Sequence, residues 1–325
     1  MVTTFRRVLC PVDFSAHSER ALRHALATAR RHESALTVLH VEDVILGAAR
    51  AELHLGAQGE DESVEELRDF VNGAGGEGQN VKVLMTAGDA VRGILEQATH
   101  ESSDLIVMGT RGRSGLARVI LGSVTEGVVR QSACPVMTIP PAWDPPAANE
   151  LEPFDPILCA SDFSPACRKA LDLAISMGQE ADARLILLHA LQLPQFDAGL
   201  PPTAVPTQTH IDFSEFRIDA LARLERGLPG DAEFRCRPEA VVVDGHPADA
   251  ILQVAHHENA KLIVMGVQAR GAFDRLLFGS TTRWVMQRAI CPVLSVRADQ
   301  AAEAWAAWQP SFHETVGAAT ASFSE

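Results

Sequence analysis

The feature that most constrains the fold of this chain is an internal repeat. Residues 8–15 (VLCPVDFS) recur as residues 157–164 (ILCASDFS), at an offset of 149. Further along, residues 104–139 align with residues 261–296 at an offset of 157, and 14 of these 36 positions are identical. The longer offset places eight extra residues inside the second copy. A repeated chain of 325 residues predicts two similar domains.

Each copy alternates apolar runs of strand length with segments whose apolar residues recur every three to four positions. In the first copy this pattern predicts strands at 8–12, 36–41, 81–85, 105–108 and 136–139, and helices at 18–31, 63–71, 90–100 and 123–132. The strands are apolar throughout, as parallel strands covered by helices on both faces are. We therefore expect the α/β class, with two tandem doubly wound five-stranded parallel sheets of the Rossmann-like type.

Proline marks the boundary between the copies. Residues 140–156 are dense in proline, which neither a helix interior nor a central strand accepts. We expect a first domain at 1–140, a linker at 141–154, a second domain at 155–298 and a tail at 299–325. The sequence leaves the roles of two segments open. Trp305 and Trp308 of the tail suit docking onto the body or contact with a partner, and residues 193–209 suit a lid or a mobile loop.

Composition narrows the class of partner. Lys and Arg number 28 against 42 Asp and Glu, so a net charge of −14 repels nucleic acid and anionic membranes. The absence of Tyr and an aromatic content of 5% disfavour a base-stacking surface. No apolar run reaches the length of a membrane span, and no secretory signal opens the chain. Six cysteines without a C-x-x-C pair or zinc-ligand spacing predict free thiols in a reducing compartment, and hence a cytoplasmic protein. Four of them lie in apolar strand-like runs and are expected to be buried: Cys10, Cys134, Cys159 and Cys291.

Residues suited to an anionic ligand follow the expected strands at their carboxyl ends, where doubly wound sheets bind ligands. Asp13 follows the first strand, residues 109–115 (GTRGRSG) follow the fourth, and Gly122 and Ser123 then open a helix. Glycine lets backbone N–H groups approach a phosphate, and a helix start offers unpaired N–H groups. The two arginines of 109–115 can neutralise charge, and a carboxylate such as Asp13 can accept a hydrogen bond from a base or a sugar. Together these features predict a nucleotide pocket.

Each of these features also has a simpler interpretation. Ser123 and Glu126 fit a capping box, the glycines suit a flexible loop, and Asp13 suits an acid at the start of the next helix. The second copy argues against capping as the sole reason for the serine. There residues 279–280 (Gly-Ser) persist, whereas residues 281–283 (TTR) contain no partner for a capping box.

The glycine loop carries a resemblance to a known family. Its spacing is Gly109, two residues, Gly112, nine residues, Gly122 and then Ser123. In its strand–loop–helix setting this spacing resembles the nucleotide loop of universal stress proteins, over residues 5–140 and 155–297. The resemblance implies an adenine nucleotide alpha hydrolase-like fold in each copy and ATP as ligand, with AMP or ADP as alternatives and Mg²⁺ held through the phosphates. By position it implicates Pro11, Asp13 and Val41 for adenine and ribose. For ribose and phosphates it implicates Met108, Gly109, Arg111, Gly112, Gly122, Ser123, Val124 and Thr125.

The second copy departs from this pattern. Where the first copy has Pro11, Val41, Gly112 and Gly115, the second has Ala160, Ala190, Ala269 and Ala272. The methyl group of Ala269 would occupy space that the backbone needs near a phosphate, and it disfavours a positive φ. The resemblance therefore implies a weaker second site, formed by Asp162, Met265, Gly266, Gly279, Ser280 and Thr281.

Other motifs do not have the structural surroundings that their usual function requires. Residues 73–78 (GAGGEG) match G-x-G-x-x-G, but they follow a helix and precede a strand, so we expect a loop there. His40 and His189 end the second strand of each copy, which favours a repeated packing or hydrogen-bonding role. Residues 256–258 (HHE) suit solvated or capping side chains. The sequence holds no Walker loop, nucleophile elbow or H-E-x-x-H, and we expect no catalytic residues and no dedicated metal ligands.

Three functions stay open at this point. We favour a nucleotide-binding stress-response module; the alternatives are a slow ATPase and an interaction protein that binds no nucleotide. The resemblance also implies that the strands at 136–139 and 293–296 pair, so that the two copies form an intramolecular pseudo-dimer. A further homodimer stays open.

Overall fold

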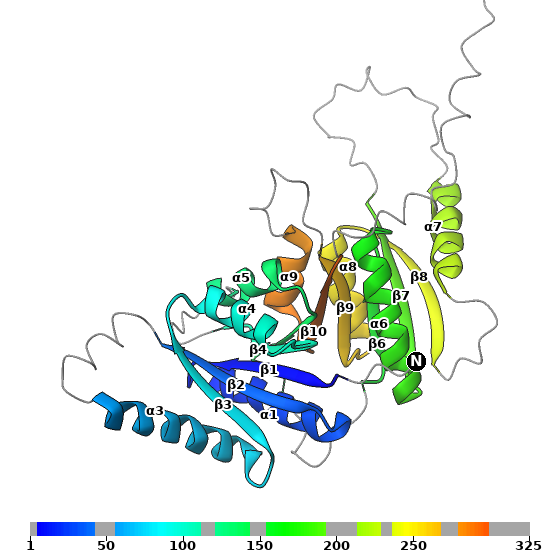
Figure 1. Ribbon diagram of the computed structural model, residues 1–325. Helices are drawn as coiled ribbons and strands as arrows, with labels where there is room; N and C mark the ends of the chain where they lie inside the picture. Colours follow the sequence, from blue (N-terminus) through cyan, green and yellow to red (C-terminus); the bar gives the residue numbers. More distant parts are fainter. Residues whose placement is uncertain are drawn as a thin grey trace, which may run out of the picture.

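The protein forms one ten-stranded sheet covered by helices on both faces (Figure 1). The structure, a computed structural model, describes residues 5–42, 56–111, 121–143, 154–192, 213–228, 236–267 and 279–298. The strands of the first copy are β1 (Arg7–Val12), β2 (Ala35–Glu42), β3 (Val81–Ala87), β4 (Leu105–Gly109) and β5 (Val136–Ile139). Those of the second copy are β6 (Ile157–Ala160), β7 (Arg184–Leu191), β8 (Arg237–Asp244), β9 (Leu262–Val267) and β10 (Val293–Arg297).

The strand order is β3-β2-β1-β4-β5-β10-β9-β6-β7-β8. Within each copy neighbouring strands are parallel, which confirms the predicted doubly wound α/β fold. The two copies join where β5 pairs with β10 in the antiparallel sense, with Met137 opposite Leu294. The two five-stranded sheets are therefore one continuous sheet, as the expected pseudo-dimer requires.

Helices cover the two faces in equivalent sets. The helices are α1 (Ala16–His32), α3 (Gly56–Val71), α4 (Ala90–His100), α5 (Ser123–Gln131), α6 (Pro165–Ala181), α7 (Phe213–Gly227), α8 (Pro247–His257) and α9 (Ser280–Arg288). Residues of α1, α3, α6 and α7 pack into one apolar core, and residues of α4, α5, α8 and α9 pack into the other. Each core runs across both copies, so burial of apolar surface stabilises the pairing as well as each half.

Local sequence explains why α1 and α6 match in length, at 17 residues each. The Ser15 hydroxyl accepts the backbone N–H of the third helical residue in α1, and Ser164 does the same in α6. Each helix ends at an acidic residue in the left-handed region, Glu33 with φ 52° and Asp182 with φ 51°. With Ser15 as its N-cap, α1 begins at Ala16, two residues before the predicted start at residue 18.

The sequence predicted a loop at residues 73–78, the glycine-rich segment that matched a dinucleotide motif. The structure shows a helical turn in part of this segment. Residues Asn72–Gly76 form a π-helical turn that continues α3, and Gly75 within it has φ 95°. The Arg30 guanidinium donates a hydrogen bond to the Gly75 carbonyl oxygen over 2.8 Å. Packing against α1 holds this turn, since a Cβ on Gly76 would lie 3.3 Å from the Leu26 side chain.

All six cysteines are free, and all but the half-buried Cys134 are buried. Burial raises the pKa of the Cys10, Cys159 and Cys291 thiols, which keeps them protonated in the core. This confirms the predicted burial of Cys10, Cys159 and Cys291, whereas the predicted burial of Cys134 is only partial. In the part of the chain that the structure describes, no helix has the length and apolarity that a membrane crossing needs.

Candidate functional site

The candidate site lies where β1, β2 and β4 end side by side. β1 is hydrogen-bonded to β2 on one side and to β4 on the other, so their carboxyl ends share one edge of the sheet. This brings together five of the predicted residues: Pro11, Asp13, Val41, Met108 and Gly109. Pro11 and Met108 are buried, while Asp13 and Val41 are half-buried. Gly112, Gly115, Arg113, Ala269 and Ala272 lie outside the described residues.

Asp13 shapes the turn between β1 and α1. Its carboxylate oxygen Oδ1 accepts the Ser15 backbone N–H over 3.1 Å and the Ser15 hydroxyl over 2.6 Å. Its own backbone N–H donates to the Ser18 hydroxyl oxygen over 3.2 Å. Between them Phe14 adopts a positive φ of 61°. Asp13 therefore supports the start of α1 through the cap Ser15, and this turn fixes the carboxylate at the sheet edge.

Gly109 is required for contact between β4 and α1. A Cβ at this position would lie 3.0 Å from the carbonyl oxygen of His17 in the first turn of α1. The Gly109 carbonyl oxygen accepts a hydrogen bond from the buried Thr125 hydroxyl over 2.9 Å. The sequence predicted a glycine here for the approach of a phosphate. In the structure the glycine first allows a close approach between two elements of the chain.

Helix α5 begins at the same edge without a side-chain cap. Its N-cap is Gly122, whose backbone N–H donates to the Thr110 carbonyl oxygen over 2.9 Å. Ser123 is the first helical residue and is exposed, and among the residues that the structure describes no side chain accepts the N–H groups of the first turn. The capping box of Ser123 and Glu126 is therefore wrong. Glu126 instead forms an ion pair with Arg283 of α9, with 3.5 Å between Oε2 and Nη2.

The first turn of α1 adds His17 and Arg20, which sequence reasoning missed. The Nδ1 atom of His17 is buried and has no hydrogen-bond partner among the described residues. Burial lowers the pKa of His17, the nearby Arg111 and Arg20 lower it further, and Asp13 opposes them. His17 therefore lies within electrostatic range of residues from two strand ends. The only sequence signal was its place in the turn that follows Asp13.

The second copy forms the same edge with different chemistry. Asp162 Oδ1 accepts the Ser164 backbone N–H over 2.9 Å and the Cys167 thiol over 3.0 Å. Burial alone would raise the pKa of Asp162, but the hydrogen bonds from Cys167 and Ser164 lower it below its usual value. The contact at Gly266 is tighter than that at Gly109, because a Cβ there would lie 2.4 Å from the Cys167 backbone nitrogen.

The remaining residues of the second site lie at positions equivalent to those of the first site. Two basic residues of the first site have no basic equivalent in the second. Met265 is buried at the end of β9, and Gly279 caps α9 without a side-chain hydrogen bond, ahead of Ser280 and Thr281. In sequence, Ala166 stands in place of His17 and Gln268 in place of Arg111. The second edge therefore has two fewer basic side chains to offer an anion.

His40 and His189 have the repeated structural role that the sequence predicted. His40 Nδ1 donates to the Val12 carbonyl oxygen, and His189 Nδ1 donates to that of Ser161, each over 2.8 Å. Each imidazole also lies against a phenylalanine: Phe14 at 4.7 Å and Phe163 at 4.4 Å between ring centroids. These contacts tie the second strand of each copy to the turn after the first.

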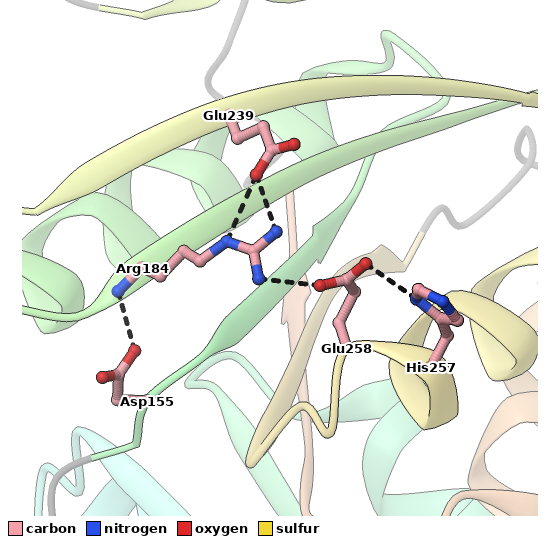
Figure 2. A network of polar contacts seen from close by, with 5 residues as sticks. All are labelled: Asp155, Arg184, Glu239, His257 and Glu258. Atoms are coloured by element: carbon pink, nitrogen blue, oxygen red, sulfur yellow. Dashed lines mark hydrogen bonds and ion pairs between the residues drawn. The ribbon is translucent and has the colours of Figure 1, made fainter.

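One further network of polar residues lies at the opposite edge of the sheet, where the strands begin. Figure 2 shows Arg184, at the amino end of β7, donating to Glu239 over 2.7 Å and to Glu258 over 2.7 Å. Glu258 also accepts a hydrogen bond from His257 over 2.9 Å, and Asp155 accepts the Arg184 backbone N–H. His256 and His257 are exposed, as predicted. Among the described residues, no three His, Cys, Asp or Glu side chains gather as a metal site.

A small pocket of about 40 Å³ lies between α6 and α7 in the second copy. Phe163, Cys167 and Arg223 contribute to its lining, and the Arg223 guanidinium stacks 4.0 Å from the Phe163 ring centroid. The pocket has room for a few water molecules. Burial raises the pKa of the Cys167 thiol to about 12, so this thiol is not a nucleophile at neutral pH.

Fold and site together define a class: a tandem doubly wound α/β protein whose uncapped helix starts lie beside the ends of the central strands. The chain belongs to the universal stress protein family, because the model of the Universal stress protein family matches residues 4–140 and again 153–297.

Individual relatives agree with this assignment. A universal stress protein of Mycolicibacterium smegmatis is 27% identical over 300 residues, which cover 89% of this chain and 96% of the relative. A shorter one from Thermus aquaticus is 35% identical over 144 residues, covering 44% of this chain and 99% of the relative. The crystal structure of a universal stress protein from Archaeoglobus fulgidus has a TM-score of 0.63 at 23% identity, covering 90% of this chain and 98% of its own. This last likeness supports the fold.

Proposed function

We propose that the first copy binds an adenine nucleotide, ATP or its AMP and ADP relatives, as a stress-response module. Pro11, Asp13 and Val41 would contact adenine and ribose. The ribose and phosphates would lie against Met108, Gly109, Arg111, Gly112, Gly122, Ser123, Val124 and Thr125. The second copy, with Asp162, Met265, Gly266, Gly279, Ser280 and Thr281, would bind more weakly.

The observation that carries this proposal is the uncapped start of α5 beside Arg111. The first-turn N–H groups of a helix have no partner within the helix, and no side chain of the described part of the chain caps them here. They lie at the positive end of the helix dipole, which favours an anion. A phosphate chain would supply the missing acceptors, and Arg111 would neutralise part of its charge.

The residues of this edge also fit Mg²⁺ bound through the nucleotide. Mg²⁺ usually keeps several waters and binds through phosphate oxygens with one or two protein oxygens. The exposed Ser123 hydroxyl is at the start of α5, where it can serve as such a ligand. Asp13 Oδ1 is already used by Ser15, which favours binding over catalysis by this carboxylate.

A sharp test is titration calorimetry with ATP on Gly122→Asp. Gly122 has φ −61°, and a Cβ there would meet its nearest neighbour at 3.5 Å, so the backbone accepts a side chain. An aspartate at the N-cap accepts the first-turn N–H groups itself. We therefore expect an unchanged or higher Tm together with a loss of ATP binding of at least tenfold, because the carboxylate competes with phosphate.

The matched control is Gly279→Asp, the equivalent change at the start of α9. Gly279 has φ −55° and similar space, so the two variants are equally well tolerated. We expect Gly279→Asp to keep most of the ATP binding. If the unaltered protein shows no heat and no Tm increase with millimolar ATP, the proposal is overturned and the interaction protein without nucleotide is favoured.

We also propose the domain division at 1–140 and 155–298, with a linker at 141–154 and a tail at 299–325, and a cytoplasmic location. The alignment of equivalent strands and helices supports the division. The six free cysteines support a reducing compartment.

A further inference from the structure

The two copies are related by a pseudo-twofold axis that passes between β5 and β10. Met137 and Leu294 are equivalent residues of the two copies and lie directly opposite each other. On either side of them the contacts repeat. The Thr138 hydroxyl donates to the Val293 carbonyl oxygen over 3.3 Å, and the Ser295 hydroxyl donates to that of Val136 over 3.0 Å. Residues close to this axis therefore meet their own equivalents.

One ion pair across the axis joins helices α5 and α9. Glu126 lies in the first turn of α5 and Arg283 in the first turn of α9, with 3.5 Å between Oε2 and Nη2. The two residues are separated by 157 positions, the offset that relates these parts of the copies. They are therefore the same position of the repeat, with opposite charges.

A second ion pair across the axis joins helices α1 and α6. Arg31 and Glu180 lie in their last turns, with 3.6 Å between Nε and Oε1, and His32 Nδ1 lies 3.4 Å from the same carboxylate oxygen. Arg31 and Glu180 are separated by 149 positions, the offset of this part of the repeat. This pair, too, places opposite charges at one position of the repeat. Its signs are reversed relative to the first: the acid is now in the second copy.

A twofold interface brings each near-axis position against itself. If two first copies paired, Arg31 would face a second Arg31 and Glu126 a second Glu126. Two second copies would in the same way bring Glu180 and Arg283 against themselves. Only the pairing of unlike copies brings opposite charges together at both positions.

The strands alone do not supply this discrimination. β5 (VMTI) and β10 (VLSV in its first four residues) are similar in shape and polarity, and a strand edge can pair with any chain that presents another edge. Side-chain charges near the axis can discriminate where the backbone cannot, because they make the pairing of two like copies unfavourable.

We propose that Arg31, Glu126, Glu180 and Arg283 form a charge code that makes a first copy pair with a second copy and rejects pairing between like copies. The code selects an unlike copy, which the covalent connection supplies within the same chain. If β5 and β10 were separated, the code would also specify the new partner of each strand, which is the opposite copy in another molecule of this protein. The code does not depend on nucleotide binding.

The first test reverses charges on one side only, in the full-length chain. One variant carries Arg31→Glu with Glu126→Arg, and another carries Glu180→Arg with Arg283→Glu. Each brings like charges together, and we expect the Tm to fall by roughly 4 °C at low salt and by less in 1 M NaCl. Combining all four changes restores opposite charges, so the Tm should return to that of the unaltered protein. A matched control reverses an exposed pair within one helix, Arg92→Glu with Glu96→Arg, which should leave the Tm unchanged.

The second test mixes the two one-sided variants. The first copy of one variant is then complementary to the first copy of the other, and the same holds for their second copies. We expect each variant alone to have the mass of one chain by light scattering, and the mixture, after a brief unfolding and refolding, to form a one-to-one complex.

The proposal is overturned if the one-sided variants keep the unaltered Tm, or if the fourfold variant fails to recover it. A mixture without the one-to-one complex also overturns it. Should the one-sided variants fail to fold, the fourfold variant decides, because it contains the same substitutions with the charges matched.

Discussion

The Thr125 hydroxyl donates a hydrogen bond to the Gly109 carbonyl oxygen over 2.9 Å, which ties the first turn of α5 to the end of β4. The two residues are separated by the whole glycine loop in sequence. This bond sets where the uncapped start of α5 lies relative to the strand ends. The geometry of the candidate nucleotide site therefore depends on a hydrogen bond within the chain that a buried side chain makes.

We expect Thr125→Val to lower the free energy of unfolding by about 1–2 kcal/mol, since the buried Gly109 carbonyl loses a partner and valine keeps the shape. Urea unfolding measures this change. ATP affinity should fall as well, because the start of α5 is no longer held. Ser123→Ala is the control for stability: this residue is exposed, so its change should stay within about 0.5 kcal/mol. Equal stability of Thr125→Val and the unaltered protein would contradict the assigned role.

The two equivalent glycines at the ends of β4 and β9 should differ in tolerance to alanine. A Cβ on Gly266 would lie 2.4 Å from a backbone nitrogen, whereas one on Gly109 would lie 3.0 Å from a backbone oxygen. We expect Gly266→Ala to cost about 3 kcal/mol and Gly109→Ala about 1 kcal/mol in unfolding free energy. Urea denaturation of both variants in parallel tests the order. The reverse order would show that α6 can shift away from β9 more easily than α1 from β4.

His24 should make the protein sensitive to acid. Both ring nitrogens are buried without a hydrogen-bond partner, and burial lowers the pKa of His24 to about 4. In the unfolded chain this histidine takes up a proton near pH 6.5, whereas in the folded protein it does so only near 4. Stability should therefore be full above pH 6.5 and decline as the pH falls towards 4, by about 3 kcal/mol in total.

The second copy supplies the test of this prediction, since Leu173 occupies the position equivalent to His24. We expect His24→Leu to raise the free energy of unfolding at pH 7 by about 1–2 kcal/mol, because it removes two unpaired buried nitrogens. It should also flatten the decline between pH 6.5 and 4. Urea unfolding across this range measures both effects, and an unchanged pH profile in the variant would argue against His24 as the source.

His17 should couple nucleotide binding to proton uptake. Burial and the charges of Arg111 and Arg20 lower its pKa in the free protein. A bound polyphosphate would offset these cations and raise the pKa of His17 again, so ATP should bind more tightly as the pH falls towards the range in which His17 takes up a proton. Calorimetry in buffers of different ionisation enthalpy counts the protons taken up.

The comparison variant is His17→Asn, since the terminal phosphate of ATP titrates in the same range and must be separated from the histidine. Proton uptake on binding should be smaller in this variant at the same nucleotide concentration. If uptake is identical in both proteins, the phosphate alone accounts for it, and His17 has no part in binding.

Much of the fold was predictable because its signals are local. Expected and observed strands agree to within two residues at each end in the first copy, as at 36–41 against Ala35–Glu42. The bounds of the helices were predicted less well than those of the strands. α3 starts at Gly56 rather than at residue 63, and it continues into a turn that the glycines of 73–78 did not suggest.

Residues whose neighbours come from another element are the ones whose roles the sequence pattern did not explain. Gly127 is an unfavourable residue for a helix interior, but a Cβ there would lie 2.7 Å from the Val91 side chain of α4. In the second copy the sizes are reversed: the small residue Ala248 stands in place of Val91, and the large residue Trp284 stands in place of Gly127. His17 was missed at the candidate site for the same reason: its relation to β4 depends on how α1 packs.

The sequence by itself determined that there are two copies, the order of their strands and helices, and the strand ends at which Asp13 and Gly109 stand. These follow from periodicity and from residues close together in the chain. The family resemblance implied that β5 and β10 pair, whereas only the tertiary structure decided that Glu126 meets Arg283 and that Arg31 meets Glu180. Such contacts result from the packing of whole faces about an axis, and no local pattern of residues encodes where that axis lies.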